Sequence, residues 1–389
     1  MIPVARPDVG TKELERIRKT LESGWIGLGP KVTEFETKFG GTFGHEHVIA
    51  TNSGTSALDL ALKSCELDGT EVLVPPITWI STAFVVLYNE LDVAWVDVEP
   101  DTLNMSPEAL RDRITDETAA VIPVHYGGQP AEIEPITEIA HEHGAIVIED
   151  CAHAAGTEID DEPIGSVGDV GCFSFQATKP LTTGEGGAVV TQDRVVAERA
   201  RRLSKLGVDK STHERSEEAG YSWYYEVTDV GYKSFMNDIA AGIGLVQLER
   251  LPQTRARRNQ VAAAYNDAFG QLEWVLPLFE KEHATHARYN YSIRVPKEHR
   301  DAIIEHLAEH EVGASVHYMP LYKHPVFEGP EPWLPTTERV WKQILTLPMS
   351  STFSDEEVAK VVDAVRSYGD GRSIGEPTLT EADRGRRAG

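Results

Sequence analysis

The sequence predicts an α/β fold in which helices cover both faces of a mostly parallel, seven-stranded sheet. Three observations predict this fold. Short apolar runs alternate with amphipathic stretches over the first 190 residues, the runs are four to six residues long and rich in Val and Ile, and Gly, Pro, Asp or Asn bounds each run. Near-continuous apolar strands separated by helices are typical of a parallel sheet that is buried on both faces.

The predicted elements of this first part follow the alternation. The expected strands are residues 47–51, 71–74, 93–97, 119–124, 145–149, 170–175 and 187–191. The expected helices between them are residues 55–67, 78–89, 106–114 and 132–143. Ser106 followed by Pro107 indicates a helix start, since Ser is a good N-cap and Pro is favoured at the first helical position.

The second part of the chain predicts a long helix and a smaller α+β unit. The helical pattern runs over residues 239–251, meets Pro252 and resumes to residue 266. After it we expect a strand at residues 289–295 and helices at residues 300–311 and 355–368. The predicted organisation is a large ligand-binding domain with the N-terminal segment (1–250), a small C-terminal domain (251–369) and a polar, disordered tail (370–389).

Composition excludes several classes of protein. The 389 residues include 62 acidic and 37 basic side chains, a net charge of −25, so nonspecific nucleic-acid binding is not expected. No stretch approaches the roughly 20 apolar residues of a membrane helix, and the first residues lack the apolar core of a signal peptide. Cys65, Cys151 and Cys172 form no CxxC pair and predict reduced thiols. We therefore expect a cytoplasmic protein without a membrane partner.

The acid excess has two possible meanings. The acids are spread along the chain, and only 14 of the 37 basic residues are Lys. A dispersed carboxylate surface with few lysines suits a halophilic cytosol, where salt screens self-repulsion. The alternative is an ordinary acidic enzyme.

Small and hydroxyl-bearing residues follow the first predicted strand, where the next helix begins. They are Gly54, Thr55 and Ser56. The N-terminus of a helix offers free backbone N–H groups and a positive dipole end to an anion, most often phosphate. Taken alone, these residues fit a simple helix cap better than a phosphate site, and the Gly-Lys-Ser/Thr sequence of a Walker loop does not occur.

Other polar or aromatic side chains follow further strands. Trp79, after the second strand, predicts either core packing or a flat surface for an aromatic ligand. Glu149 and Asp150 close the fifth strand, and a buried acid there needs a cation or a protonated ring nitrogen as partner. His153 comes next and predicts either a satisfied core histidine or a functional one.

Lys179 follows the sixth predicted strand in an apolar setting of small residues, five positions after Ser174. It is the only lysine between Lys63 and Lys205. Most lysines are solvated surface charges. One at the mouth of a buried sheet is a candidate for a lowered pKa and Schiff-base chemistry.

Ligands of open α/β sheets bind beyond the carboxyl ends of the strands, so these side chains are expected to share one site. A phosphate-binding helix start, a flat aromatic, a carboxylate, a hydroxyl and a lysine match the needs of pyridoxal 5′-phosphate (PLP). No metal site competes. His283 and His286 lie in a polar, loop-like stretch, and His141 and His143 point to different faces of a helix end.

The ordered motifs resemble the sugar-nucleotide aminotransferases of the DegT/StrS type, which are PLP enzymes of fold type I. The resemblance spans about residues 3–368 and is carried by residues 23–30, 52–55, 149–150, 174–179 and 182–187. Residues 317–321 also fit. Residues 222–227 and 231–233 are most similar to enzymes that act on UDP-linked 4-keto sugars.

The resemblance implies a role for each matching residue. Lys179 would bind the cofactor covalently and, once released, shuttle a proton. Asp150 would keep the pyridine nitrogen protonated, Trp79 would stack on the ring, and His153 would approach it. The residues implied in phosphate binding are Gly54, Thr55, Ser56 and Ser174. The region around Lys233 would reach the phosphate of a neighbouring subunit, which implies a homodimer with a shared active site.

Two places depart from the family pattern. Pro180 follows the lysine where the family commonly has Asn, which removes one backbone donor. Ser234 and Phe235 replace the aromatic and polar residues that usually contact the phosphate of the neighbouring subunit, and Lys233 itself could supply that contact.

The implied function is transfer of an amino group from glutamate to a keto group of a nucleotide-linked sugar, with UDP as the expected nucleotide. Such products are precursors of cell-surface polysaccharides or glycans. One alternative is a PLP-dependent sugar-nucleotide dehydratase, but those relatives have His in place of Lys179. Another is a non-catalytic regulatory homologue, against which the intact set of Lys179, Asp150 and Ser174 argues.

Overall fold

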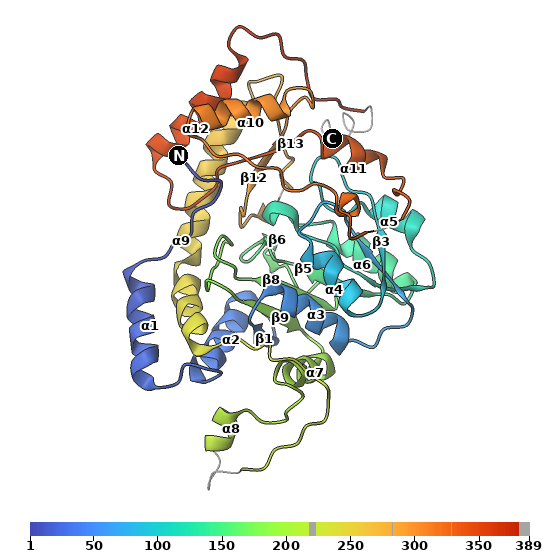
Figure 1. Ribbon diagram of the computed structural model, residues 1–389, viewed down its shortest axis with the longest axis vertical. Coiled ribbons are helices and arrows are strands. Elements are labelled where there is room, and N and C mark those ends of the chain that lie inside the picture. Colours follow the sequence, from blue (N-terminus) through green and yellow to red (C-terminus); the bar gives the residue numbers. More distant parts are fainter. Residues whose placement is uncertain (218–222, 282, 328, 381–389) are drawn as a thin grey trace.

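The computed structural model describes residues 1–217, 223–281, 283–327 and 329–380 (Figure 1). Its main feature is a seven-stranded sheet, as predicted. The strands are β1 (His47–Thr51), β2 (Glu71–Val74), β3 (Asp92–Trp95), β4 (Thr118–Val121), β5 (Ile146–Asp150), β8 (Val170–Ser174) and β9 (Gly187–Thr191). Their order is β1-β9-β8-β5-β4-β2-β3, and only β9 runs antiparallel to its neighbours. The predicted fold class is confirmed.

Helices cover both faces of this sheet, as the apolar strands predict. On one face lie α3 (Gly54–Ser64), α4 (Ser81–Tyr88) and α7 (Arg194–Ser204), which share one apolar core with the strands. On the other face lie α2 (Pro30–Phe43), α5 (Pro107–Arg113), α6 (Ile133–Glu142) and α9 (Asp238–Phe269). Both cores take alternate residues of the same strands, which is the consequence of a two-residue side-chain period.

Several element boundaries differ from the prediction. Strand β4 stops at Val121, two residues before Pro123, and β5 continues through Asp150. The helices α1 (Thr11–Ser23) and α2 were not predicted. The expected interruption of the long helix is wrong, because α9 contains Pro252 within one continuous helix. Buried side chains on both sides of that proline, including Leu251 and Val261, hold the helix together by packing.

A second, smaller core lies around the C-terminal half of α9. Its sheet consists of β10 (Leu276–Pro277), β12 (Tyr291–Arg294) and β13 (Ile344–Leu347). The helices α10 (Arg300–Glu309) and α12 (Asp355–Gly369) pack against this sheet, and α11 (Pro335–Val340) lies beside it. Ile2 is buried in the same core, so the first residues of the chain pack together with α10 and α12. Helix α9 runs unbroken past residue 250, and the division into domains stays a prediction.

Short elements complete the fold. A third sheet is formed by β6 (Glu158–Ile159), β7 (Glu162–Pro163) and β11 (Ala284–Thr285), and the remaining elements are α8 (Thr212–Glu217), η1 (Tyr126–Gly128) and η2 (Leu321–Lys323). The three cysteines are free and buried. Among the described residues, no helix is long and apolar enough to cross a lipid bilayer.

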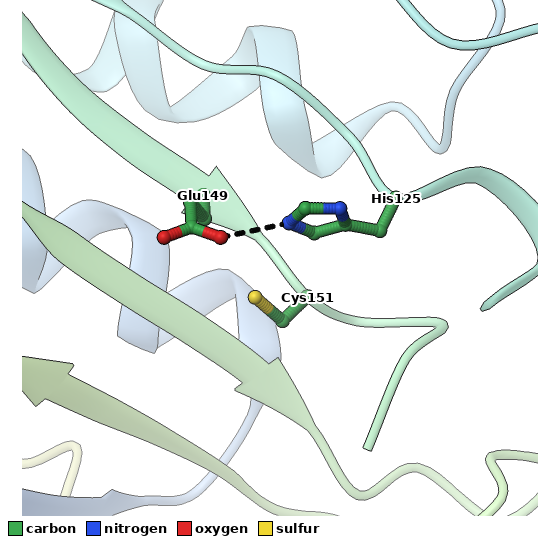
Figure 2. Close-up of side chains that lie close together, drawn as sticks. All are labelled: His125, Glu149 and Cys151. Atoms are coloured by element: carbon green, nitrogen blue, oxygen red, sulfur yellow. Dashed lines mark hydrogen bonds and ion pairs between the residues drawn. The ribbon is translucent and has the colours of Figure 1, made fainter. Parts of the chain in front are cut away.

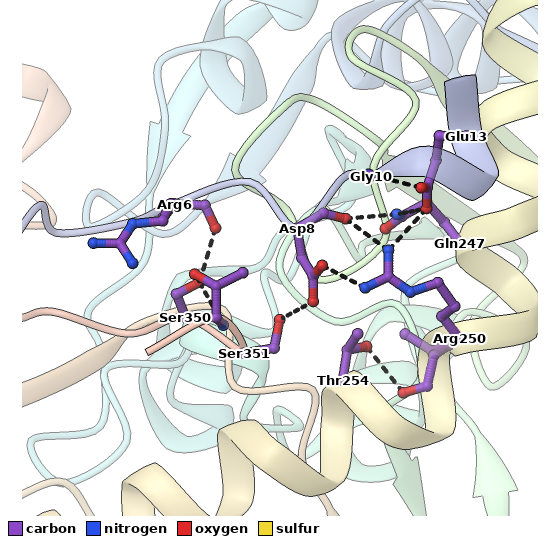
Figure 3. Close-up of polar contacts among 11 residues, drawn as sticks. Arg6, Asp8, Gly10, Glu13, Gln247, Arg250, Thr254, Ser350 and Ser351 are labelled. Atoms are coloured by element: carbon purple, nitrogen blue, oxygen red, sulfur yellow. Dashed lines mark hydrogen bonds and ion pairs between the residues drawn. The ribbon is translucent and has the colours of Figure 1, made fainter. Parts of the chain in front are cut away.

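Polar contacts hold the N-terminal segment to α9 (Figure 3). The carboxylate of Asp8 accepts hydrogen bonds from Arg250 and from Ser351. Buried Glu13 accepts from Arg250 at 2.9 Å and from Gln247 at 2.8 Å. These bonds tie the start of the chain both to α9 and to the loop before α12.

The described part of the predicted disordered tail contacts the small core. The carbonyl oxygen of Thr378 accepts hydrogen bonds from Arg294 at 3.2 Å and from Gln343 at 3.3 Å, and Pro377 is buried. Residues 381–389 of the predicted tail lie outside the described residues.

Candidate active site

A cavity of about 450 Å³ lies at the carboxyl ends of the parallel strands. This size is within the range of cofactor and small-molecule pockets. Seven of the nine side chains predicted for the site line it: Gly54, Thr55, Trp79, Asp150, His153, Ser174 and Lys179. The prediction that strand ends of one sheet assemble the site therefore holds for these residues, while their individual roles stay predictions.

The start of α3 forms one wall of the cavity. Ser53 caps the helix, because its Oγ accepts a hydrogen bond from the backbone N–H of Ser56 at 3.1 Å. The first N–H groups of a helix have no partner within the helix and are available to an anion. A Cβ on Gly54 would lie 2.7 Å from Cβ of Ser174, so only glycine lets this helix start approach the end of β8. The start of α3 can therefore be capped by Ser53 and still bind a phosphate through its backbone N–H groups.

Two of the predicted residues lie elsewhere. The hydroxyl of Ser56 donates to Asn52 Oδ1 at 2.7 Å, and Ser56 does not line the cavity. Lys233 is exposed and forms an antiparallel bridge with Lys205, away from the cavity. This position agrees with a role toward a second subunit, which stays a prediction.

Asp150 ends β5 and is buried at the base of the cavity. Its Oδ2 accepts a hydrogen bond from Thr82 at 2.8 Å, and its Oδ1 accepts one from the backbone N–H of Ala152 at 3.0 Å. Burial nevertheless raises the pKa of this carboxyl group, since these two donors do not offset its desolvation. A protonated ring nitrogen would supply the missing positive charge.

Lys179 reaches the cavity from a tight turn after β8, in which its backbone N–H donates to the carbonyl of Gln176 at 2.9 Å. Burial lowers the pKa of its amine. The Nζ atom lies 4.0 Å from the ring centroid of Tyr289. A lowered pKa favours the neutral amine, which is the nucleophile that covalent attachment of a carbonyl cofactor requires.

The structure excludes a core position for Trp79 and leaves His153 compatible with both of its alternatives. Trp79 is 59% exposed and contacts Tyr318 with 6.2 Å between ring centroids, so it is a rim residue and not part of the core. His153 is buried and hydrogen-bonded, yet it also lines the cavity. Its Nδ1 accepts from the N–H of Gly127 at 3.3 Å, and its Nε2 lies 3.3 Å from the Tyr318 hydroxyl.

Among the lining residues that were not predicted for the site are Thr82, Tyr289, His317 and Tyr318. The last two lie in the segment 317–321, which the family resemblance includes, so a signal for them existed. Tyr289 precedes β12 of the small core and reaches the cavity only through the packing of the two parts. Nothing in its sequence surroundings indicates this.

A second cluster of ligand-like side chains lies beside the site (Figure 2). His125, Glu149 and Cys151 are buried with their polar atoms within 4.8 Å of one another. Glu149 Oε2 accepts from His125 at 2.9 Å and from Gly165 N–H at 2.9 Å.

The other oxygen of Glu149 is also satisfied by the chain. Oε1 accepts from the N–H groups of Val167 and Gly168, at 2.9 and 2.7 Å. His125 Nδ1 accepts from Ala131 N–H at 3.1 Å, so the proton of a neutral ring lies on Nε2 and points at Glu149. The lone pairs of Glu149 and His125 are thus used within the chain, which favours a structural role for these two residues over metal binding.

The cavity fits PLP by the chemistry of its donors. It offers helix N–H groups for a phosphate, a buried carboxylate that lacks a counter-charge, an exposed indole for a flat ring and a lysine with a lowered pKa. Gly54, Thr55 and Ser174 would hold the phosphate, Asp150 the ring nitrogen, Trp79 and His153 the ring, and Lys179 the carbonyl carbon.

Comparison with known proteins agrees with this geometry. The model of the DegT/DnrJ/EryC1/StrS aminotransferase family matches residues 7–366. The spore coat polysaccharide biosynthesis protein SpsC of Bacillus subtilis is 39% identical over 375 residues, which cover 94% of this chain and 96% of that protein.

Solved structures give the same result. The aminotransferase TlmJ of Streptoalloteichus hindustanus is 33% identical, with a TM-score of 0.88 over 94% of this chain and 98% of that one. Spr1654 of Streptococcus pneumoniae, solved in a PLP form and a PMP form, gives TM-scores of 0.87 and 0.88 at 29% and 28% identity, again over 94% of this chain and 98% of that one. The chain therefore belongs to the DegT/DnrJ/EryC1/StrS aminotransferase family, and its cofactor is PLP.

Proposed function

We propose that this protein transfers the amino group of glutamate to the keto carbon of a nucleotide-linked sugar, with a UDP-linked 4-keto sugar as the expected acceptor. The reaction supplies an amino sugar for cell-surface polysaccharide or glycan synthesis and takes place in the cytoplasm. The observation that carries the proposal is the meeting of Lys179, Asp150 and the start of α3 in one cavity of a sugar aminotransferase fold.

PLP, when bound, supplies an electron-withdrawing ring that stabilises negative charge on the carbon losing its proton. Lys179 binds the cofactor and, when free, moves a proton with its amine. Its lowered pKa favours this, because a general base must be neutral at working pH. Asp150 would keep the ring nitrogen of the cofactor protonated. Trp79 would stack on the face of the ring that points toward the opening of the cavity.

A homodimer with shared sites is part of the proposal. The segment that leads to Lys233 exposes large apolar side chains, among them Trp223 at 78% and Val230 at 98% exposure. Apolar groups gathered on a surface are typical of an interaction site. A second copy of the chain would cover them and bring Lys233 to the cofactor phosphate of its partner.

The activity test uses full-length enzyme with PLP, glutamate and a panel of UDP-, dTDP- and GDP-linked 4-keto sugars. We expect 2-oxoglutarate to form with the UDP substrates, and the sugar product to gain an amino group by mass spectrometry. Lys179→Ala should abolish turnover, and borohydride should attach the cofactor to Lys179 in the wild type only. Loss of a hydroxyl without gain of nitrogen would favour the dehydratase, and PLP binding without any accepted sugar would favour the regulatory homologue.

The shared site is tested by mixing two inactive variants, Lys179→Ala and Lys233→Ala. If each site uses Lys179 of one subunit and Lys233 of the other, every hybrid dimer has one intact site. Subunit exchange in an equal mixture should then recover roughly one quarter of the wild-type activity. No recovery, with hybrid dimers confirmed by native mass spectrometry, would contradict the shared site and leave the aminotransferase proposal standing.

A further inference from the structure

Tyr289 occupies an unusual place in the cavity, because it contacts both the lysine and the histidine of the site. Its ring centroid lies 4.0 Å from Lys179 Nζ and 4.3 Å from the imidazole of His153, with an angle of 17° between the two rings. Its backbone N–H donates to the carbonyl of Gly127 at 3.0 Å. Tyr289 is thus held at the junction of the small core and the strand ends.

The histidine in this stack is a neutral, oriented ring. Gly127 N–H donates to Nδ1 of His153, so the imidazole carries its proton on Nε2, 3.3 Å from the Tyr318 hydroxyl. Burial lowers the pKa of His153 well below its usual value, and that of His317 to about 4. Neither imidazole competes as a cation for the electron-rich face of Tyr289 near neutral pH.

The surroundings of Lys179 provide the ammonium with a weak partner. The titratable groups that line the cavity with it are Asp150, His153, Glu185, Tyr289, His317 and Tyr318. Within the described part of the chain Lys179 makes no ion pair, and its amine lies over the ring of Tyr289, while the Tyr289 hydroxyl and the charge of Asp150 only partly oppose the lowering of its pKa by burial. An aromatic face attracts an ammonium group less strongly than a carboxylate does, so a lysine resting there can leave again.

We propose that Tyr289 is a positioning residue whose ring is the resting place of the Lys179 amine whenever this lysine is not bound to the cofactor. The contact keeps the amine beside the reacting carbon and prevents it from folding back into the apolar wall. This inference rests on the proposed role of Lys179 and adds to it a residue from the small core. The contact with Tyr289 would keep the Lys179 amine close to the cofactor during the steps in which the lysine is not covalently attached to it.

The matched pair Tyr289→Leu and Tyr289→Phe tests the ring. Leu removes the aromatic face, whereas Phe keeps the face and removes only the hydroxyl. The measurement is the pH dependence of Lys179 acetylation by acetic anhydride, followed by mass spectrometry of the peptide. It uses full-length protein, both free of cofactor and loaded with pyridoxamine phosphate.

We expect the midpoint of labelling to fall by about one pH unit in Tyr289→Leu and by clearly less in Tyr289→Phe, because loss of the aromatic face removes the cation–π contact that favours the ammonium, whereas Phe loses only the hydroxyl. An unchanged midpoint in Tyr289→Leu would overturn the proposal. An equal shift in Tyr289→Phe would also overturn it and assign the effect to the hydroxyl. Tyr289→Met serves as the second aliphatic variant if Tyr289→Leu fails to fold.

A second readout separates this inference from the proposed function. Borohydride reduction of the PLP-loaded protein should label Lys179 in wild type and in all Tyr289 variants. Absence of that label in the wild type would contradict the role of Lys179, whatever the acetylation midpoint shows. A normal label together with unshifted acetylation would reject only the resting place.

Discussion

Glu149 and Asp150 are consecutive, buried carboxylates at the end of β5, and they differ in how many hydrogen bonds they accept and in the direction of their pKa shifts. Glu149 accepts three backbone N–H bonds and one from His125. Burial alone would raise its pKa, but these hydrogen bonds lower it. Asp150 accepts only two hydrogen bonds, and burial raises its pKa.

The difference shows how a structural carboxylate can be distinguished from a functional one. Neighbours in a strand point to opposite faces of the sheet, so the two side chains meet unrelated surroundings. Glu149 has every acceptor position filled by its own chain, and nothing remains for a ligand. Asp150 faces a cavity, and neither its two hydrogen-bond donors nor the nearby Lys179 offsets the cost of burying its charge. Incomplete satisfaction of the buried Asp150 charge therefore favours this carboxylate, and not Glu149, as the partner that we propose for the cofactor.

The largest loss of activity is expected for Asp150→Asn. Removing the carboxylate takes away the counter-charge of the cofactor ring, and kcat should fall by about 10²- to 10⁴-fold, as for a broken buried ion pair. The cofactor-free variant should unfold at the same urea concentration as wild type or a higher one, since Asn removes a desolvated charge. Steady-state kinetics and urea unfolding measure both. A variant with normal kcat would show that Asp150 is not the counter-charge.

For Glu149→Gln we expect a loss of stability and not a loss of cofactor binding. An amide cannot accept all four hydrogen bonds, so the variant should lose about 3 kcal/mol of unfolding free energy. Its folded fraction should bind PLP with nearly wild-type affinity, measured by cofactor fluorescence at low temperature. Wild-type stability combined with weakened PLP binding would reverse the assignment of the two carboxylates.

The affinity for PLP should depend on pH through the ionisation of the Asp150 carboxyl group. PLP needs the ionised carboxylate, and a raised pKa means that affinity is complete above that pKa and falls as the pH decreases through it. The expected loss is about tenfold per pH unit below the pKa. Lys179 and the cofactor phosphate also titrate, so Asp150→Asn is the control. A pH profile that Asp150→Asn leaves unchanged would show that the carboxyl group does not control binding.

The smallest expected effect concerns salt. With a net charge of −25, the protein repels a substrate that carries a diphosphate, as well as its own second copy. Raising KCl from low to molar concentration should increase activity and dimer stability by about two- to fivefold, because salt screens surface charges. Glu149→Gln and wild type should respond alike, since that pair is buried. Flat activity over this range would favour an ordinary acidic enzyme.

Much of the site could be predicted because its signals are local. Gly54, Asp150 and Lys179 each follow or end an apolar strand, and parallel strands bring their carboxyl ends to one edge. Helix α2 also had a readable pattern, since its buried Val32, Phe35 and Phe39 recur at helical spacing, but the segment was not predicted. Tyr289 gave no such signal, because it reaches the cavity from a separate core.

The sequence by itself determined the alternation of strands and helices, the order of the motifs and, through them, the cofactor and the family. These features depend on short-range periodicity and on residue types at fixed spacing. Only the tertiary structure decided which of the two carboxylates, Glu149 or Asp150, has its acceptor positions filled by the chain. Hydrogen-bond satisfaction depends on partners far along the chain, such as His125 and Gly168 for Glu149 and Thr82 for Asp150. The spacing of residues in the sequence does not show whether a buried carboxylate receives enough hydrogen bonds, because its donors are brought to it only by the packing of the folded chain.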